Sequence, residues 1–161
     1  MQTILGSVRQ ALVSGTVAAA TTSLAAALAG KRETGSYVAP LNATSHIIWG
    51  DQEARQNDTS FKYTLTGVLL NYGAGIFWAA FYERWFGRGG HPDAQRSLSR
   101  PLIGAAVVTA GAYLTDYYLV PKRFTPGYEL RLSGKSLLAI YGALALGLAM
   151  RDMRADIRAG T

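Results

Sequence analysis

The chain contains no cysteine, and it carries few charged residues for its length. Without cysteine it can form no disulfide bond, no thiolate metal site and no thiol-based catalytic centre. Charged residues make up 16% of the 161 residues, whereas soluble domains carry about 25%. The sequence also lacks a glycine-rich phosphate loop, the Ser-x-x-Lys and Gly-x-Ser-x-Gly motifs and any HExxH-type spacing. These absences favour a membrane protein over a soluble one, and a non-catalytic protein over an enzyme.

The charges that are present are clustered, and long apolar segments lie between them. No charged residue occurs at positions 11–29, 63–82 or 101–115. A helix rises about 1.5 Å per residue, so about 20 residues cross a hydrocarbon core of about 30 Å. The segments of this kind cover about residues 4–29, 63–82, 101–120 and 136–150. We therefore predict an all-α fold, an integral membrane four-helix bundle that forms a single membrane domain, 1–161.

The first apolar segment, 4–29, is built mainly from small residues and permits two interpretations. Arg9 ahead of an alanine-rich run, with Ala27 and Ala29 at its end, resembles a secretory signal with a cleavage site. The segment is longer than the usual core of such a signal, and we interpret it as a true span. A helix of such weak hydrophobicity gains little from lipid and much from close packing. We expect it to lie against a partner helix or another subunit.

The longest connection covers residues 31–60, and loops of this length are often functional. Its centre, residues 40–55, predicts a short helix that lies in the membrane interface. Trp49 is the expected anchor, because its ring is apolar and its N–H is polar.

Polar residues gather on the side of the bundle that the first and third loops share. The candidate polar site consists of His46, Asp51, Glu53, Asp116, Tyr117, Lys122 and Arg123. Asp116 lies five residues before Pro121 and so about one helical turn inside the membrane boundary. An acid at this depth is costly unless it is paired or reaches water. It either handles a proton or a cation, or it forms an ion pair with Lys62, Lys122 or Arg123.

His46 also has two interpretations. It is a ligand or proton relay with Asp51 or Glu53, or it is a polar residue at headgroup level. Seven residues separate His46 from Glu53, which places both on one helix face only if the helix continues through Gly50. The other histidine, His91, lies on the opposite side of the bundle, so the two do not form a pair of haem ligands. We predict no cofactor, no metal site and no catalytic residue.

Asn71 lies near the middle of the second span. An amide at this depth commonly donates a hydrogen bond to a neighbouring helix. The alternative is that Asn71 lines a ligand cavity.

Several local strings in the second half of the chain carry a resemblance. They read Asp116-Tyr-Tyr-Leu-Val-Pro, Thr125-Pro-Gly-Tyr-Glu and Ser136-Leu-Leu-Ala-Ile-Tyr-Gly, and residues 42–51 fit the same pattern. With its four spans, the chain resembles small bacterial inner-membrane proteins of the YagU type in topology. The resemblance implies the fold and a multi-pass location in the bacterial inner (plasma) membrane, and it implies no activity.

The distribution of basic residues bears on orientation and partners. Half of the 16 Lys and Arg residues fall on each side of the predicted bundle, so the positive-inside rule gives no preference. We expect both termini in the cytoplasm. A net charge of +6 suits contact with anionic headgroups, so the lipid bilayer is an expected partner and nucleic acid is not. A further membrane subunit or a second copy of the chain is also expected.

Three hypotheses for function remain open at this point. The first is a non-catalytic accessory or assembly subunit, or a small oligomer. The second is a carrier or pore for a small solute, ion or lipid. The third is a small membrane enzyme acting on lipid or quinone, with His46 and Asp116 as its acid and base.

Overall fold

The computed structural model describes residues 4–87 and 99–160, and every regular element within these ranges is a helix. The four long helices are α1 (Ile4–Thr34), α4 (Phe61–Trp85), α5 (Ser99–Leu114) and α6 (Gly134–Gly160). Four helical segments, Gly6–Thr34, Phe61–Trp85, Ser99–Leu119 and Gly134–Ala155, are long and apolar enough to cross a membrane. The predicted all-α fold with four long apolar helices is therefore confirmed.

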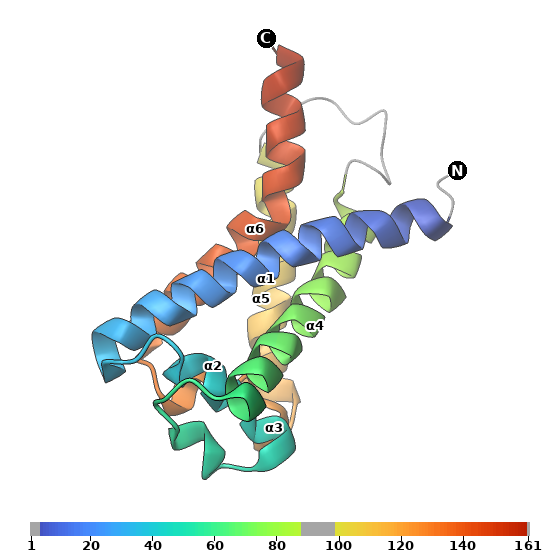
Figure 1. Ribbon diagram of the computed structural model, residues 1–161. Coiled ribbons are helices and arrows are strands. Elements are labelled where there is room, and N and C mark those ends of the chain that lie inside the picture. Colours follow the sequence, from blue (N-terminus) through green and yellow to red (C-terminus); the bar gives the residue numbers. More distant parts are fainter. Residues whose placement is uncertain (1–3, 88–98, 161) are drawn as a thin grey trace.

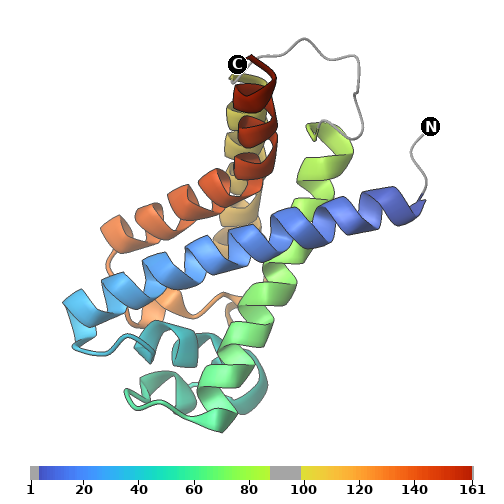
Figure 2. The same cartoon turned by 45° about the horizontal axis from the view of Figure 1, so that its top comes forward.

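The four helices are arranged around a common core. α1 packs along both α4 and α6, and α5 packs against α6 and α4 from the other side. The beginning of α1 and the end of α6 lie at one end of the molecule (Figures 1 and 2). The short helices α2 (Ala39–Thr44) and α3 (His46–Trp49) lie at the opposite end. We call residues 35–60 and 120–133, which cover this second end, the loop cap.

The small residues of α1 form the face that packs against α4 and α6. The buried residues of this face include Ala11, Ser14, Ala18, Ala19, Thr22 and Ala26. A Cβ atom on Gly15 would come within 2.5 Å of the Ile76 Cα, so glycine allows the backbones of α1 and α4 to touch. The larger side chains of α1, such as Leu24 and Leu28, are exposed. The expectation that this helix packs against a partner helix is met within the chain.

Most of the long helices extend beyond the predicted spans. α1 continues to Thr34, because the charged residues after Ala29 are good helix formers, and Gly35 follows it with a φ of 78°. α4 begins at Phe61, where the Ser60 hydroxyl accepts a hydrogen bond from the Tyr63 amide at 3.2 Å. α6 reaches Gly160.

The third span changes character before it ends. α5 ends at Leu114, and the chain continues as a π-helical turn over Thr115–Leu119. The Val120 amide closes this turn by donating to the Thr115 carbonyl at 3.0 Å. Such a wide turn, found often at functional sites, places Asp116 at the junction of the helix and the loop cap.

The long first loop differs from the single interfacial helix that the sequence predicts. It contains α2, α3 and a 3-10 turn at Glu53–Arg55. All six residues of α2 are buried, because the helix is packed against α4 and the end of α1. Trp49 is 46% exposed, and its Nε1 donates to the Thr66 hydroxyl at 3.2 Å. The loop therefore closes the end of the bundle.

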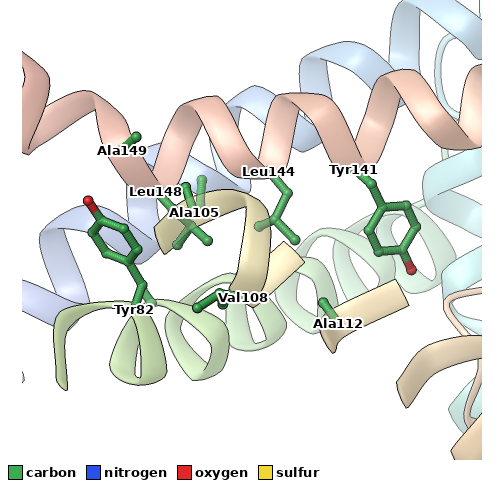
Figure 3. Close-up of a cluster of buried hydrophobic side chains, with 10 residues drawn as sticks. Tyr82, Ala105, Val108, Ala112, Tyr141, Leu144, Leu148 and Ala149 are labelled. Atoms are coloured by element: carbon green, nitrogen blue, oxygen red, sulfur yellow. The ribbon is translucent and has the colours of Figure 1, made fainter. Parts of the chain in front are cut away.

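The main core cluster joins α1, α4, α5 and α6. Its members include Ala18, Ala79, Tyr82, Ala105, Val108, Ala112, Tyr141, Leu144, Leu148 and Ala149. Tyr82 lies at one end of this cluster and Tyr141 at the other, with Val108, Leu144 and Leu148 between them (Figure 3). Small residues on α5 and α1 let the larger side chains of α6 fill the centre.

Candidate functional site

A cavity of about 270 Å³ lies between α4, α6, the π-helical turn and the loop cap. Its apolar wall includes Leu70, Ala74 and Trp78 from α4, Ile140 and Leu144 from α6, and Ile47, Phe124 and Pro126 from the loop cap. Its polar lining residues are Thr22, Thr44, Asn71, Asp116, Tyr128 and Tyr141. An apolar pocket with a few polar groups is the usual form of a small-molecule site.

Asp116 lines this cavity from the π-helical turn. Its Oδ2 accepts a hydrogen bond from the Tyr141 hydroxyl at 2.6 Å. In the part of the chain that the structure describes, no ion pair joins Asp116 to Lys62, Lys122 or Arg123, so the expected ion pair is not formed. Lys62 lies instead over the Trp49 ring, with its Nζ 4.2 Å from the ring centroid. Asp116 is therefore held by a neutral partner.

Asn71 both bonds to a neighbouring helix and lines the cavity. Its Nδ2 lies within hydrogen-bond distance of the Ala19 carbonyl at 3.1 Å and of the hydroxyls of Thr22 and Ser23 at 3.1 and 2.9 Å. Its Oδ1 accepts a hydrogen bond from the Tyr128 hydroxyl at 3.1 Å. The two interpretations that the sequence offers for Asn71 are compatible.

Tyr128 connects the loop cap to the bundle. Its side chain is buried, and the preceding Gly127 has a φ of 81°, a conformation that favours glycine. Burial raises the pKa of the Tyr128 hydroxyl above its ordinary value, and the Asp116 charge adds to the increase. Tyr128 therefore remains a neutral hydrogen-bond donor toward Asn71.

His46 is buried in the loop cap and is not among the residues that line the cavity. Its Nδ1 lies 3.1 Å from Asp51 Oδ1, and its Nε2 lies 2.9 Å from the Thr125 carbonyl. Both partners are hydrogen-bond acceptors, so both ring nitrogens donate when the ring is an imidazolium. These contacts tie the first loop to the third.

The remaining predicted site residues are dispersed. α3 ends at Trp49 and Gly50 has a φ of 106°, so His46 and Glu53 share no continuous helix face. The side chain of Glu53, like residue His91, lies outside the described part of the structure. Tyr117 packs its ring against those of Tyr113 and Tyr141. Lys122 and Arg123 are exposed, and the Arg123 guanidinium donates to the Ile48 carbonyl at 3.5 Å. Of the predicted residues, Asp116 and Asn71 line the cavity.

A second polar cluster, which the sequence does not indicate, lies beyond the other end of the core. The Arg151 guanidinium lies 2.7 Å from Glu83 Oε2 and 3.0 Å from Asp152 Oδ1. The Ser14 hydroxyl donates to Glu83 Oε1 at 2.5 Å, and the Tyr82 hydroxyl donates to Asp152 Oδ2 at 3.1 Å. Glu83 and Asp152 are buried. This cluster joins α1, α4 and α6, and we assign it a structural role.

Comparison with known proteins adds no constraint to this geometry. No family model, no curated protein and no solved structure matches the chain. Among the described residues, no group of three or more His, Asp or Glu residues is placed to hold a metal ion. The function must therefore be inferred from the cavity itself.

Proposed function

We propose that this chain is a multi-pass membrane protein that binds one small, mainly apolar molecule in the cavity beneath the loop cap. The observation that carries the proposal is the cavity of about 270 Å³ with an apolar wall and one carboxylate, Asp116. An apolar wall of this kind stabilises an apolar guest, because binding removes apolar surface from water. The proposal develops the hypothesis of a carrier for a small solute or lipid.

The position of the cavity supports a ligand that arrives from the bilayer. Leu70, Ala74 and Trp78 belong to a segment long and apolar enough to span a membrane. Ala74 lines the cavity and is also exposed. An apolar solute concentrates in the hydrocarbon core, where it meets this part of α4.

The two other hypotheses have less support. The accessory-subunit hypothesis rested on the need of the first helix for a neighbour, and α4 and α6 already supply one. The enzyme hypothesis needs His46 and Asp116 to act together, but His46 is held by Asp51 and the Thr125 carbonyl. A ligand-binding role requires neither a further subunit beside the first helix nor joint action of His46 and Asp116.

A fluorescence experiment tests the proposal. Trp78 lines the cavity, and Trp49→Phe with Trp85→Phe makes it the single tryptophan. We expect 1-bromooctane to quench Trp78 saturably in detergent-solubilised protein. Ala74→Phe, which adds a ring at a lining position, should weaken binding about tenfold or more, a loss of about 1.4 kcal/mol.

Ala80→Phe is the matched control, because Ala80 is exposed on the same helix and does not line the cavity. It should leave the binding constant unchanged. Quenching that never saturates, or that Ala74→Phe leaves intact, would exclude the proposed function.

We further propose that the protein lies in the bacterial inner membrane with both termini in the cytoplasm. The beginning of α1 and the end of α6 lie at the same end of the molecule, which supports a shared side (Figure 1). The chain has no native cysteine, so an introduced cysteine is its single thiol. In intact cells an impermeant maleimide should label Asp58→Cys in the loop cap and should not label Arg154→Cys on α6. The reverse labelling pattern would show that the termini lie on the opposite side of the membrane and would contradict the proposed orientation.

A further inference from the structure

We infer that the ligand of this cavity is a lipophilic amine, whose protonated nitrogen pairs with the Asp116 carboxylate. The inference rests on the proposed function, since it names the chemical class of the molecule bound at the same site. Among the described residues that line the cavity, Asp116 is the one carboxylate, and none is lysine, arginine or histidine.

The hydrogen bonds of the cavity leave Asp116 as the group with spare capacity. The Asn71 amide is occupied on both sides, since its Nδ2 bonds to α1 and its Oδ1 accepts from Tyr128. The hydroxyls of Tyr128 and Tyr141 each already donate one hydrogen bond. Asp116 Oδ2 accepts from Tyr141, whereas Oδ1 accepts no hydrogen bond from any described residue. A ligand that donates is therefore the complement of this lining.

Charge strengthens the same conclusion. A carboxylate in a spanning segment is costly unless an opposite charge or water compensates it. In the described structure Asp116 has no cationic partner, so a bound ammonium would supply the missing charge and form a charge-assisted hydrogen bond. A carboxylate ligand would bring a second negative charge against Asp116 and be rejected.

The residues that line the cavity favour an organic amine over a metal cation as the bound cation. Hard cations take six or more oxygen ligands, but the cavity offers one carboxylate and no group of three acidic or histidine side chains lies in the described part of the chain. Leu70, Trp78 and Leu144 instead present apolar surface. This surface suits an alkyl or aryl group attached to the nitrogen.

A matched series of three compounds tests the inference. Octylamine, 1-octanol and octanoate share one tail and differ in their end groups. Each is titrated into the variant with Trp78 as its single tryptophan, with 1-bromooctane already bound. Displacement of 1-bromooctane is measured as recovery of Trp78 fluorescence. We expect octylamine to displace 1-bromooctane at about a tenth of the concentration that 1-octanol needs, or less. Octanoate should be the weakest competitor of the three.

Substitution of Asp116 tests whether its carboxylate is the cause of the preference for octylamine. Asp116→Asn should remove the advantage of octylamine and leave 1-octanol unchanged, since the shape is kept and the charge is lost. Asp58→Asn is the matched control, because Asp58 is an exposed acid that does not line the cavity. It should keep the preference of the parent protein.

The failures of the two proposals are distinguishable. Saturable binding of 1-bromooctane with equal displacement by the three compounds would overturn the amine inference and leave the apolar cavity intact. Absence of saturable 1-bromooctane binding would overturn the proposed function. If Asp116→Asn does not fold, the order of the three compounds on the parent protein still decides the inference.

Discussion

Arg151 on α6 and Glu83 on α4 form an ion pair of 2.7 Å, at the end of the bundle opposite the loop cap. The Glu83 side chain is 3% exposed and the Arg151 side chain is 26% exposed. The same guanidinium reaches Asp152, which in turn accepts from the Tyr82 hydroxyl. Since α4 and α6 otherwise make few contacts with each other, this pair is a principal direct link between them.

Arg151→Met should destabilise the fold by about 3 kcal/mol, because it leaves two buried carboxylates without their cation. The measurement is denaturant unfolding of the protein in micelles, followed by circular dichroism. Arg154→Met on the same helix removes an exposed charge and is the control, with an expected change below about 0.5 kcal/mol. Equal stability of the two variants would show that the ion pair does not hold α6 to α4.

Two glycines of α6 offer a matched test of the packing of α1. A Cβ atom on Gly147 would lie 2.6 Å from the Ala18 Cα, which is too close, whereas a Cβ on Gly142 would meet nothing within 4 Å. Gly147→Ala should therefore cost about 1–3 kcal/mol through forced separation of the helices. Gly142→Ala should stabilise by about 0.5–1 kcal/mol, because alanine favours the helix. Thermal unfolding of both variants measures the difference, and a similar loss in both would contradict the close approach of α1 and α6.

The four apolar segments could be predicted because a span is a local property of the sequence. Hydropathy and the absence of charge over 63–82 or 101–115 are enough to identify them, and the small residues of the first helix predict its close packing. The ends of the helices could not be predicted from hydropathy, because a helix continues past its apolar part until a residue such as Gly35 ends it.

The candidate site could be predicted only in part, because its residues are distant in the sequence. They come together only when separate helices pack with particular faces toward each other. Asp116 could be singled out, since an acid inside a span is unusual, but its partner Tyr141 lies 25 positions away. Similarly, 57 positions separate Asn71 from Tyr128, and 68 separate Glu83 from Arg151. A charge next to the end of a span suggests a headgroup contact, so nothing in the local pattern distinguishes Glu83 as buried.

Tyr128→Phe provides a test at high pH. The raised pKa of the Tyr128 hydroxyl means that folding favours its protonated form, so this contribution to stability is complete below the ordinary tyrosine pKa of about 10 and is lost as pH rises above it. The parent protein should therefore lose more stability between pH 8 and pH 11 than Tyr128→Phe does. At pH 8 the variant should be less stable by about 1 kcal/mol, because Asn71 loses a hydrogen bond. Parallel pH profiles of the two proteins, measured by denaturant unfolding, would contradict the burial of this hydroxyl.

His46 should be a structural residue of the loop cap. His46→Ala removes the link between α3 and the Thr125 carbonyl, so the two loops of the cap should open more often. We expect amide hydrogen exchange in residues 51–60 and 121–133 to increase about tenfold or more, with little change in the centres of α4 and α6. Asp51→Ala is the matched control: its side chain is 84% exposed, and its loss leaves the contact of Nε2 with Thr125 in place. It should raise exchange by a smaller factor. A uniform increase across all four long helices would instead indicate global destabilisation, and unchanged exchange in the cap would mean that His46 does not hold the two loops together.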